Sequence, residues 1–128
     1  MAGFKLDPMV VMIIMVAYMG FHVTLAGEVI TVGGPLGWNV PKNPKDYTLW
    51  SGKQKFLTTD VLWFTGKDSV AEVKEKAYYS CDIKNPVRLI TSGPDRITLL
   101  TPGSHFFICT KLDHCNLGQK FVANVSPS

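Results

Sequence analysis

From about residue 28 onwards, the chain consists of short apolar runs separated by polar and turn-forming residues. In the last run, Phe121, Ala123 and Val125 fall on one face of an extended chain, and the residues between them fall on the other. This period of two is typical of a half-buried strand. Most runs are rich in β-branched or aromatic side chains, which favour strands. The pattern predicts strands over residues 29–32, 61–64, 69–73, 87–90, 96–100, 105–109 and 120–125.

Turn-forming residues separate these runs. Glycine and proline cluster at residues 33–37, 41–44, 92–94 and 102–103, where proline fixes φ and glycine accepts a positive φ. Many short strands at this spacing predict an all-β domain built as a two-sheet sandwich or barrel. Any helix would be short, and the most plausible place for one is around residues 74–79.

The first part of the chain has a different pattern. Lys5 precedes an apolar run of about a dozen residues that continues to Phe21, and small residues follow at Thr24 and Ala26. This order is that of a secretory signal peptide, which we assign to residues 1–26. A membrane span is the alternative, but it needs roughly 20 apolar residues. We therefore expect cleavage near Ala26 and a secreted, extracellular protein with one domain over residues 28–126.

Charge and composition exclude several functions. The net charge is +3, and no run of Lys or Arg is longer than a Lys-x-Lys spacing, so we expect no nucleic-acid partner. The last residues form no hydrophobic tail, which argues against a lipid-anchor signal and for a soluble protein without a span after signal removal. No nucleophile motif, paired-carboxylate site or phosphate loop is present, so we do not expect an enzyme. Asn124-Val-Ser fits a glycosylation acceptor.

Three cysteines allow one disulfide and leave one thiol over. In an extended loop adjacent side chains point to opposite sides, so Cys115 could face Cys81 while His114 faces Cys109. This argument pairs Cys81 with Cys115. It leaves the Cys109 thiol near His114 and Gln119, a set that suits copper with a weak axial amide oxygen. The alternative is a buried Cys109, a surface His114 and a strand-initiating Gln119, because Cys-x4-His is a weak signature.

The residues match a known family over nearly the whole predicted domain. The sequence resembles the plant phytocyanins, a group of cupredoxins that includes plantacyanins, stellacyanins and early-nodulin-like proteins. The matching motifs are Val32-Gly-Gly34 with Gly37-Trp38, Tyr47 and Trp50, Asp60-Val-Leu-Trp-Phe64, Tyr79-Ser-Cys81, Asn85-Pro86, Ser92-Gly-Pro-Asp95, Thr101-Pro-Gly103, His105-Phe-Phe-Ile-Cys109, His114-Cys115 and Gly118-Gln-Lys120.

The resemblance implies a cupredoxin-like Greek-key fold with one disulfide. It implies that Cys109 supplies a copper thiolate and His114 a copper imidazole. It also implies that Gln119 is a stellacyanin-like axial ligand to one mononuclear copper ion. The family disulfide joins the cysteines that correspond to Cys81 and Cys115, in agreement with the pairing argued above.

One family ligand differs in this chain. Asp68 occupies the position at which the family has its first copper histidine, and no histidine is close to it in the sequence. Early-nodulin-like members also have Asp-Ser-Val there and are thought not to hold copper, but they usually lack the cysteine and the second histidine that this chain keeps. Asp68 either supplies a carboxylate oxygen that weakens affinity for copper(I), or caps the turn at Ser69 and Val70.

Other residues of interest are given structural roles. His105 lies four residues before Cys109 on a predicted strand, too far away at ~3.3 Å per residue to share a metal with it. Asp113 is interpreted as a solvated loop charge. The large aromatic residues are expected to pack in the core or between the sheets; they are Trp38, Trp50, Trp63, Tyr78 and Tyr79.

Two functions follow from the sequence. The first is an extracellular one-electron carrier with copper at Cys109, His114, Gln119 and an altered position at Asp68. The second is a copper-free binding or structural module in the apoplast, at the cell surface or in the cell wall. In both cases we expect a monomer, whose partner is a redox protein or a cell-wall or cell-surface component.

Overall fold

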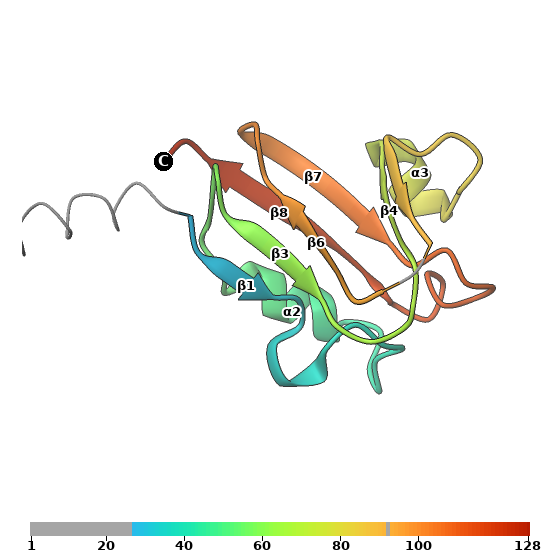
Figure 1. Ribbon diagram of the computed structural model, residues 1–128. Helices are drawn as coiled ribbons and strands as arrows, with labels where there is room; N and C mark the ends of the chain where they lie inside the picture. The colour runs from blue at the N-terminus through green and yellow to red at the C-terminus, as the bar shows by residue number, and fades with distance from the viewer. Residues whose placement is uncertain (1–26, 92) are drawn as a thin grey trace, which may run out of the picture.

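The computed structural model describes residues 27–91 and 93–128. The predicted signal peptide therefore lies outside the described residues. These residues form two sheets (Figure 1). The three-stranded sheet has the order β1-β3-β6, with β1 Val29–Thr31, β3 Val61–Phe64 and β6 Asp95–Thr98. The five-stranded sheet has the order β2-β8-β7-β4-β5, with β2 Phe56–Leu57, β8 Lys120–Ser126, β7 Gly103–Ile108, β4 Val70–Val73 and β5 Arg88–Ile90.

The predicted all-β, two-sheet class is confirmed. Each predicted run overlaps a strand, and the bounds of β3 agree with the prediction. The strand β2 was not predicted, because two residues that pair with Val125 and Ser126 carry too short a pattern to recognise. β1 runs parallel to β3 and β2 parallel to β8, while the other strand pairs are antiparallel.

Two short α-helices and one 3₁₀ turn complete the described part of the chain. α3, Glu75–Ser80, lies where the sequence predicted a helix, and η1 spans Gly34–Leu36. α2, Asp46–Gly52, was not predicted, because it buries only Tyr47 and therefore carries almost no helical period of apolar residues. None of the described helices is long and apolar enough to cross a membrane.

The core between the sheets is aromatic. Trp38 is fully buried and meets Tyr47, Phe64 and Phe121 edge-on, with ring centroids 5.1 to 6.0 Å apart. Phe121 also stacks on Phe107 across the β7–β8 pair, at 5.1 Å. Edge-to-face and stacked rings of this kind stabilise a core beyond the area they bury. The predicted inward face of β8 is confirmed, since Phe121, Ala123 and Val125 are all buried.

Two aromatic residues do not pack as predicted. The neighbours of Trp63 in β3, Leu62 and Phe64, are buried, so the alternation of the strand turns the Trp63 ring toward the surface. There the Arg96 guanidinium covers that ring at 4.0 Å. Tyr79 is 69% exposed, because Tyr78 occupies the buried face of α3.

The hydroxyl of Tyr47 connects α2 to the loop before it. It donates to the carbonyl of Gly37 and accepts a 2.8 Å hydrogen bond from the backbone N–H of Asn39. Burial raises the pKa of Tyr47 to about 12, so the hydroxyl stays protonated at neutral pH. These bonds hold the segment that carries Trp38, which in turn contacts the site described below.

We expect Tyr47→Phe to lower the free energy of unfolding by about 1 kcal/mol, because it removes the hydrogen bonds that tie the Tyr47 hydroxyl to the partly buried backbone of Gly37 and Asn39. Denaturant unfolding measures the change. Tyr79→Phe is the matched control, since this exposed side chain should be replaced at little cost. Equal losses in the two variants would show that the Tyr47 hydroxyl contributes nothing specific.

Candidate metal centre

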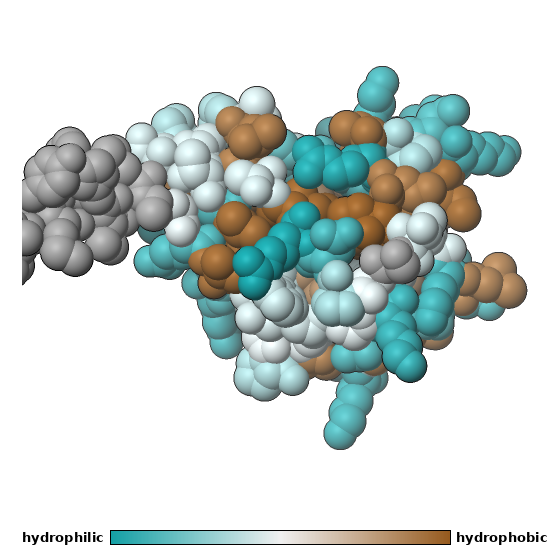
Figure 2. Space-filling model, in the orientation of Figure 1, coloured by the Kyte–Doolittle hydropathy of each residue, from teal (hydrophilic) through white to brown (hydrophobic). Residues whose placement is uncertain are grey.

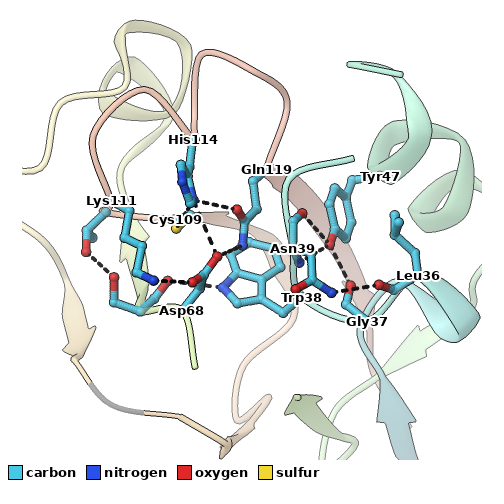
Figure 3. A network of polar contacts seen from close by, with 12 residues as sticks. Leu36, Gly37, Trp38, Asn39, Tyr47, Asp68, Cys109, Lys111, His114 and Gln119 are labelled. Atoms are coloured by element: carbon cyan, nitrogen blue, oxygen red, sulfur yellow. Dashed lines mark hydrogen bonds and ion pairs between the residues drawn. The ribbon is translucent and has the colours of Figure 1, made fainter. Parts of the chain in front are cut away.

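Strand pairing brings three separate segments together at one end of the five-stranded sheet (Figure 3). Cys109 follows β7 and Gln119 precedes β8, and the backbone N–H of Cys109 donates to the carbonyl of Gln119 at 3.0 Å. β4 pairs with the other edge of β7, which carries Asp68 to the same place. His114 lies in the loop that joins β7 to β8. The four side chains named from the sequence therefore meet in one site.

The distances within this site are short. One ligand atom each from Asp68, Cys109 and His114 lie within 4.8 Å of one another. Nδ1 of His114 is 3.6 Å from Sγ of Cys109 and 3.0 Å from Oε1 of Gln119. The same nitrogen is 3.3 Å from Oδ2 of Asp68, which also accepts a 3.1 Å hydrogen bond from Nε2 of Gln119. Cys109 and Gln119 are buried, whereas the His114 side chain is 26% exposed.

The loop that presents His114 is a series of turns. Backbone hydrogen bonds run from His114 to Lys111, from Leu117 to Asp113 and from Gly118 to Cys115. The predicted Cys81–Cys115 disulfide is confirmed, and it ties this loop to the end of α3. The pairing was argued from an extended loop, and that premise is wrong. The loop consists of turns, so a strand-like alternation does not set the directions of the His114 and Cys115 side chains. Cys109 is the free, buried thiol.

Gly118 sets the close approach of this loop to the segment around Pro44. Its φ is +104°, and a Cβ atom at this position would lie 2.5 Å from the carbonyl oxygen of Pro44. Only glycine fits such a conformation and such a contact without strain. The turn at Gly118 therefore places Gln119 in the site.

The electrostatics of the site centre on Asp68. Partial burial opposes its ionisation, but hydrogen bonds from Lys111 and Gln119 outweigh that effect and lower the pKa of Asp68. Nζ of Lys111 is 2.6 Å from Oδ1. Burial raises the pKa of Cys109, and the nearby Asp68 carboxylate adds to the rise while a hydrogen bond from the Lys111 backbone opposes it. The thiol therefore needs a cation nearby to favour its thiolate form.

Sequence reasoning missed Lys111. The only signal for it was a basic residue between Cys109 and His114, and a charged loop residue is normally interpreted as solvated. The role of Asp68 as a cap for the turn at Ser69 is not observed among the described hydrogen bonds. Instead, the Trp38 indole donates to the Ser69 carbonyl at 3.0 Å, which anchors the segment from the core side.

The other residues weighed from the sequence lie outside the site. Nε2 of His105 is 2.8 Å from the carbonyl oxygen of Thr101 and Nδ1 is 3.3 Å from the Glu72 carboxylate, which is a structural role as expected. Asp113 is exposed, as predicted for a solvated charge. Asn124 is also exposed and accepts a hydrogen bond from Ser104.

The donor set fits a copper ion. It offers a thiol sulfur, an imidazole nitrogen, a carboxylate oxygen and an amide oxygen, all converging on one point of the structure. Thiolate and imidazole are ligands that copper prefers, and a weak amide oxygen is a known axial contact. The carboxylate is the harder ligand, and it favours copper(II) over copper(I).

Comparison with known proteins identifies the family. The family model for the plastocyanin-like domain matches residues 38–119. Pollen allergen Amb a 3 of Ambrosia artemisiifolia var. elatior is 60% identical over 105 residues, which cover 77% of this chain and 97% of that protein. The blue copper protein of Arabidopsis thaliana is 37% identical over 106 residues, or 80% of this chain and 54% of that protein.

Solved structures agree with these relatives. Stellacyanin from cucumber, solved with Cu²⁺, has a TM-score of 0.73 and 30% identity, covering 80% of this chain and 98% of that one. The cucumber basic protein, a blue copper protein, has a TM-score of 0.65 and 28% identity, covering 77% and 99%. The fold and the ligand-bearing loop define a cupredoxin-like domain. The chain belongs to the plant phytocyanins.

Proposed function

We propose that this phytocyanin is a secreted one-electron carrier of blue-copper type whose site uses Asp68 where the family uses a histidine. The observation that carries the proposal is the convergence of Asp68, Cys109 and His114 within 4.8 Å, with Gln119 beside them. Relatives described as a blue copper protein and as a copper-containing stellacyanin support it. When bound, copper supplies a reversible one-electron couple.

The residues of the site would have separate roles in that function. Cys109 and His114 would be the main donors, Gln119 a weak amide donor, and Asp68 the carboxylate donor. Buried Cys109 and Gln119 exclude water from one side. The partly exposed edge of His114 would face a redox partner. A site anchored at the ends of β4, β7 and β8 and by the disulfide would change its geometry little between the oxidation states of a bound ion, which suits electron transfer.

The surface around the loop supports contact with a partner. Figure 2 shows hydrophobic surface at the end of the molecule that carries the β7–β8 loop and α3. Leu112 is 87% exposed in that loop, and it lines a hollow together with Ile83. Secretion to the apoplast, cleavage near residue 26, a monomeric state and glycosylation of the exposed Asn124 belong to the same proposal.

One observation favours a second function, a copper-free module at the cell surface or cell wall. The side chains of the site already satisfy one another, since Gln119 bridges His114 and Asp68 while Lys111 neutralises the carboxylate. These contacts satisfy the polar atoms of Asp68, Lys111, His114 and Gln119 without an ion. Early nodulin-like protein 2 of Arabidopsis thaliana, 41% identical over 70% of this chain and 26% of its own length, supports this second candidate.

Copper titration distinguishes the two candidates. The protein is expressed from the full chain, recovered from the medium and titrated with copper(II). We expect an intense thiolate-to-copper absorption in the visible that saturates at one equivalent, because Cys109 would donate to the metal. Cys109→Ser is the control and should bind without that absorption. A wild type that stays colourless and binds no copper tightly would contradict the carrier and favour the copper-free module.

A further inference from the structure

The two oxygens of the Asp68 carboxylate have different surroundings. Oδ1 is paired with Nζ of Lys111 at 2.6 Å on the solvent side, where the Lys111 side chain is 49% exposed. Oδ2 faces inward and lies close to Nδ1 of His114 and Nε2 of Gln119. Lys111 therefore holds the carboxylate by its outer oxygen and leaves the inner oxygen directed at the other donors (Figure 3).

This arrangement changes the charge of the donor set. A blue-copper site with one thiolate, two imidazoles and a neutral axial ligand carries a single negative charge before the metal is added. Replacing one imidazole by the Asp68 carboxylate adds a second negative charge. The Lys111 ammonium, in direct contact with that carboxylate, cancels the added charge.

We propose that Asp68 and Lys111 act together as a neutral unit in place of the missing imidazole, and that Lys111 thereby sets the preference of the site between copper(I) and copper(II). The inference rests on the proposed function, because it concerns copper at this site. Lys111 is a positioning and charge-compensating residue and is not itself a ligand.

The physical reason is Coulombic. Copper(I) carries one positive charge less than copper(II), so an uncompensated carboxylate favours copper(II) more strongly than copper(I). The ammonium opposes this bias and keeps the reduced form accessible, which a reversible carrier requires. Because Lys111 is half exposed, solvent screens the effect, and we expect it to change the ratio of the two affinities by about tenfold and not by many orders of magnitude.

The geometry argues against Lys111 as a competitor that simply blocks the metal. A blocking ammonium would contact the oxygen that faces Cys109 and His114, whereas Nζ contacts Oδ1. The inner oxygen Oδ2 lies beside the His114 nitrogen and the Gln119 amide. Hydrogen-bonded carboxylates of this kind are typical of metal sites, where an outer partner orients the ligand.

The test compares four proteins expressed from the full chain: wild type, Lys111→Met, Lys111→Arg and Lys67→Met. Affinities for copper(II) and copper(I) are measured separately by competition with chelators specific for each oxidation state. We expect Lys111→Met to lower the ratio of copper(I) to copper(II) affinity by about tenfold. Lys111→Arg keeps the charge and should stay within about twofold of wild type. Lys67→Met removes an exposed charge next to Asp68 in the chain, and its affinity ratio should also stay within about twofold of wild type.

Three results would overturn the inference, and only the last of them also overturns the proposed function. If wild type binds copper and Lys111→Met changes both affinities by the same factor or not at all, Lys111 does not tune the site, although the proposed function stands. If Lys67→Met shifts the ratio as far as Lys111→Met does, the effect is one of net charge and the Asp68–Lys111 unit is refuted. A wild type that binds neither form of copper would overturn the proposed function and this inference together.

Discussion

Replacing Asp68 by histidine is expected to raise the affinity of the site for copper by on the order of 100-fold, taking as a scale the roughly 10- to 100-fold effect of changing an outer partner of a metal ligand. The substitution restores a borderline nitrogen where a hard oxygen now lies, and copper(I) should gain more than copper(II). Competition titration measures both affinities, and the visible absorption reports whether a blue thiolate site forms.

The matched control for this experiment is Asp113→His. Asp113 is next to His114 in the chain, but it is exposed, so a histidine there adds the same chemical group without completing the donor set. The comparison also decides between the two proposed functions. If Asp68→His turns blue while the parent binds nothing, the copper-free module is favoured. If the parent already binds copper as tightly as Asp68→His does, the carboxylate is an adequate ligand and the copper-free module is contradicted.

Removing the disulfide is expected to have the largest effect on stability. The double variant Cys81→Ala, Cys115→Ala opens a cross-link between residues 34 apart in the chain. Chain-entropy estimates for a loop of this size predict a loss of about 3 to 4 kcal/mol in the free energy of unfolding, because the unfolded chain regains freedom. Denaturant unfolding measures this loss.

The same variant should also weaken copper binding, because Cys115 anchors the turn that presents His114. Cys109→Ala, which removes the buried thiol but keeps the disulfide, is the control. It should abolish the thiolate absorption at a smaller cost in stability. A double variant as stable as wild type would show that the cross-link does not restrict the unfolded chain in the way assumed.

Local patterns account for most of the secondary structure that was predicted correctly. The alternation over residues 120–125 predicted β8 and its buried face, since a period of two depends only on the strand itself. α2 and β2 could not be found in this way. α2 buries one residue and β2 contains two, so the packing partners of these elements, Phe121 and Val125 among them, specify them more than their own residues do.

Residue identities and motif spacing were enough to predict the family, the disulfide and the four side chains of the candidate site, Asp68, Cys109, His114 and Gln119. The contacts of Asp68, by contrast, depend on the three-dimensional fold. The pairing of β4 with β7 places it beside Cys109, and the turns after β7 bring Lys111 onto its outer oxygen. No local pattern encodes that ion pair, since it joins two loops that meet only when the sheet has formed.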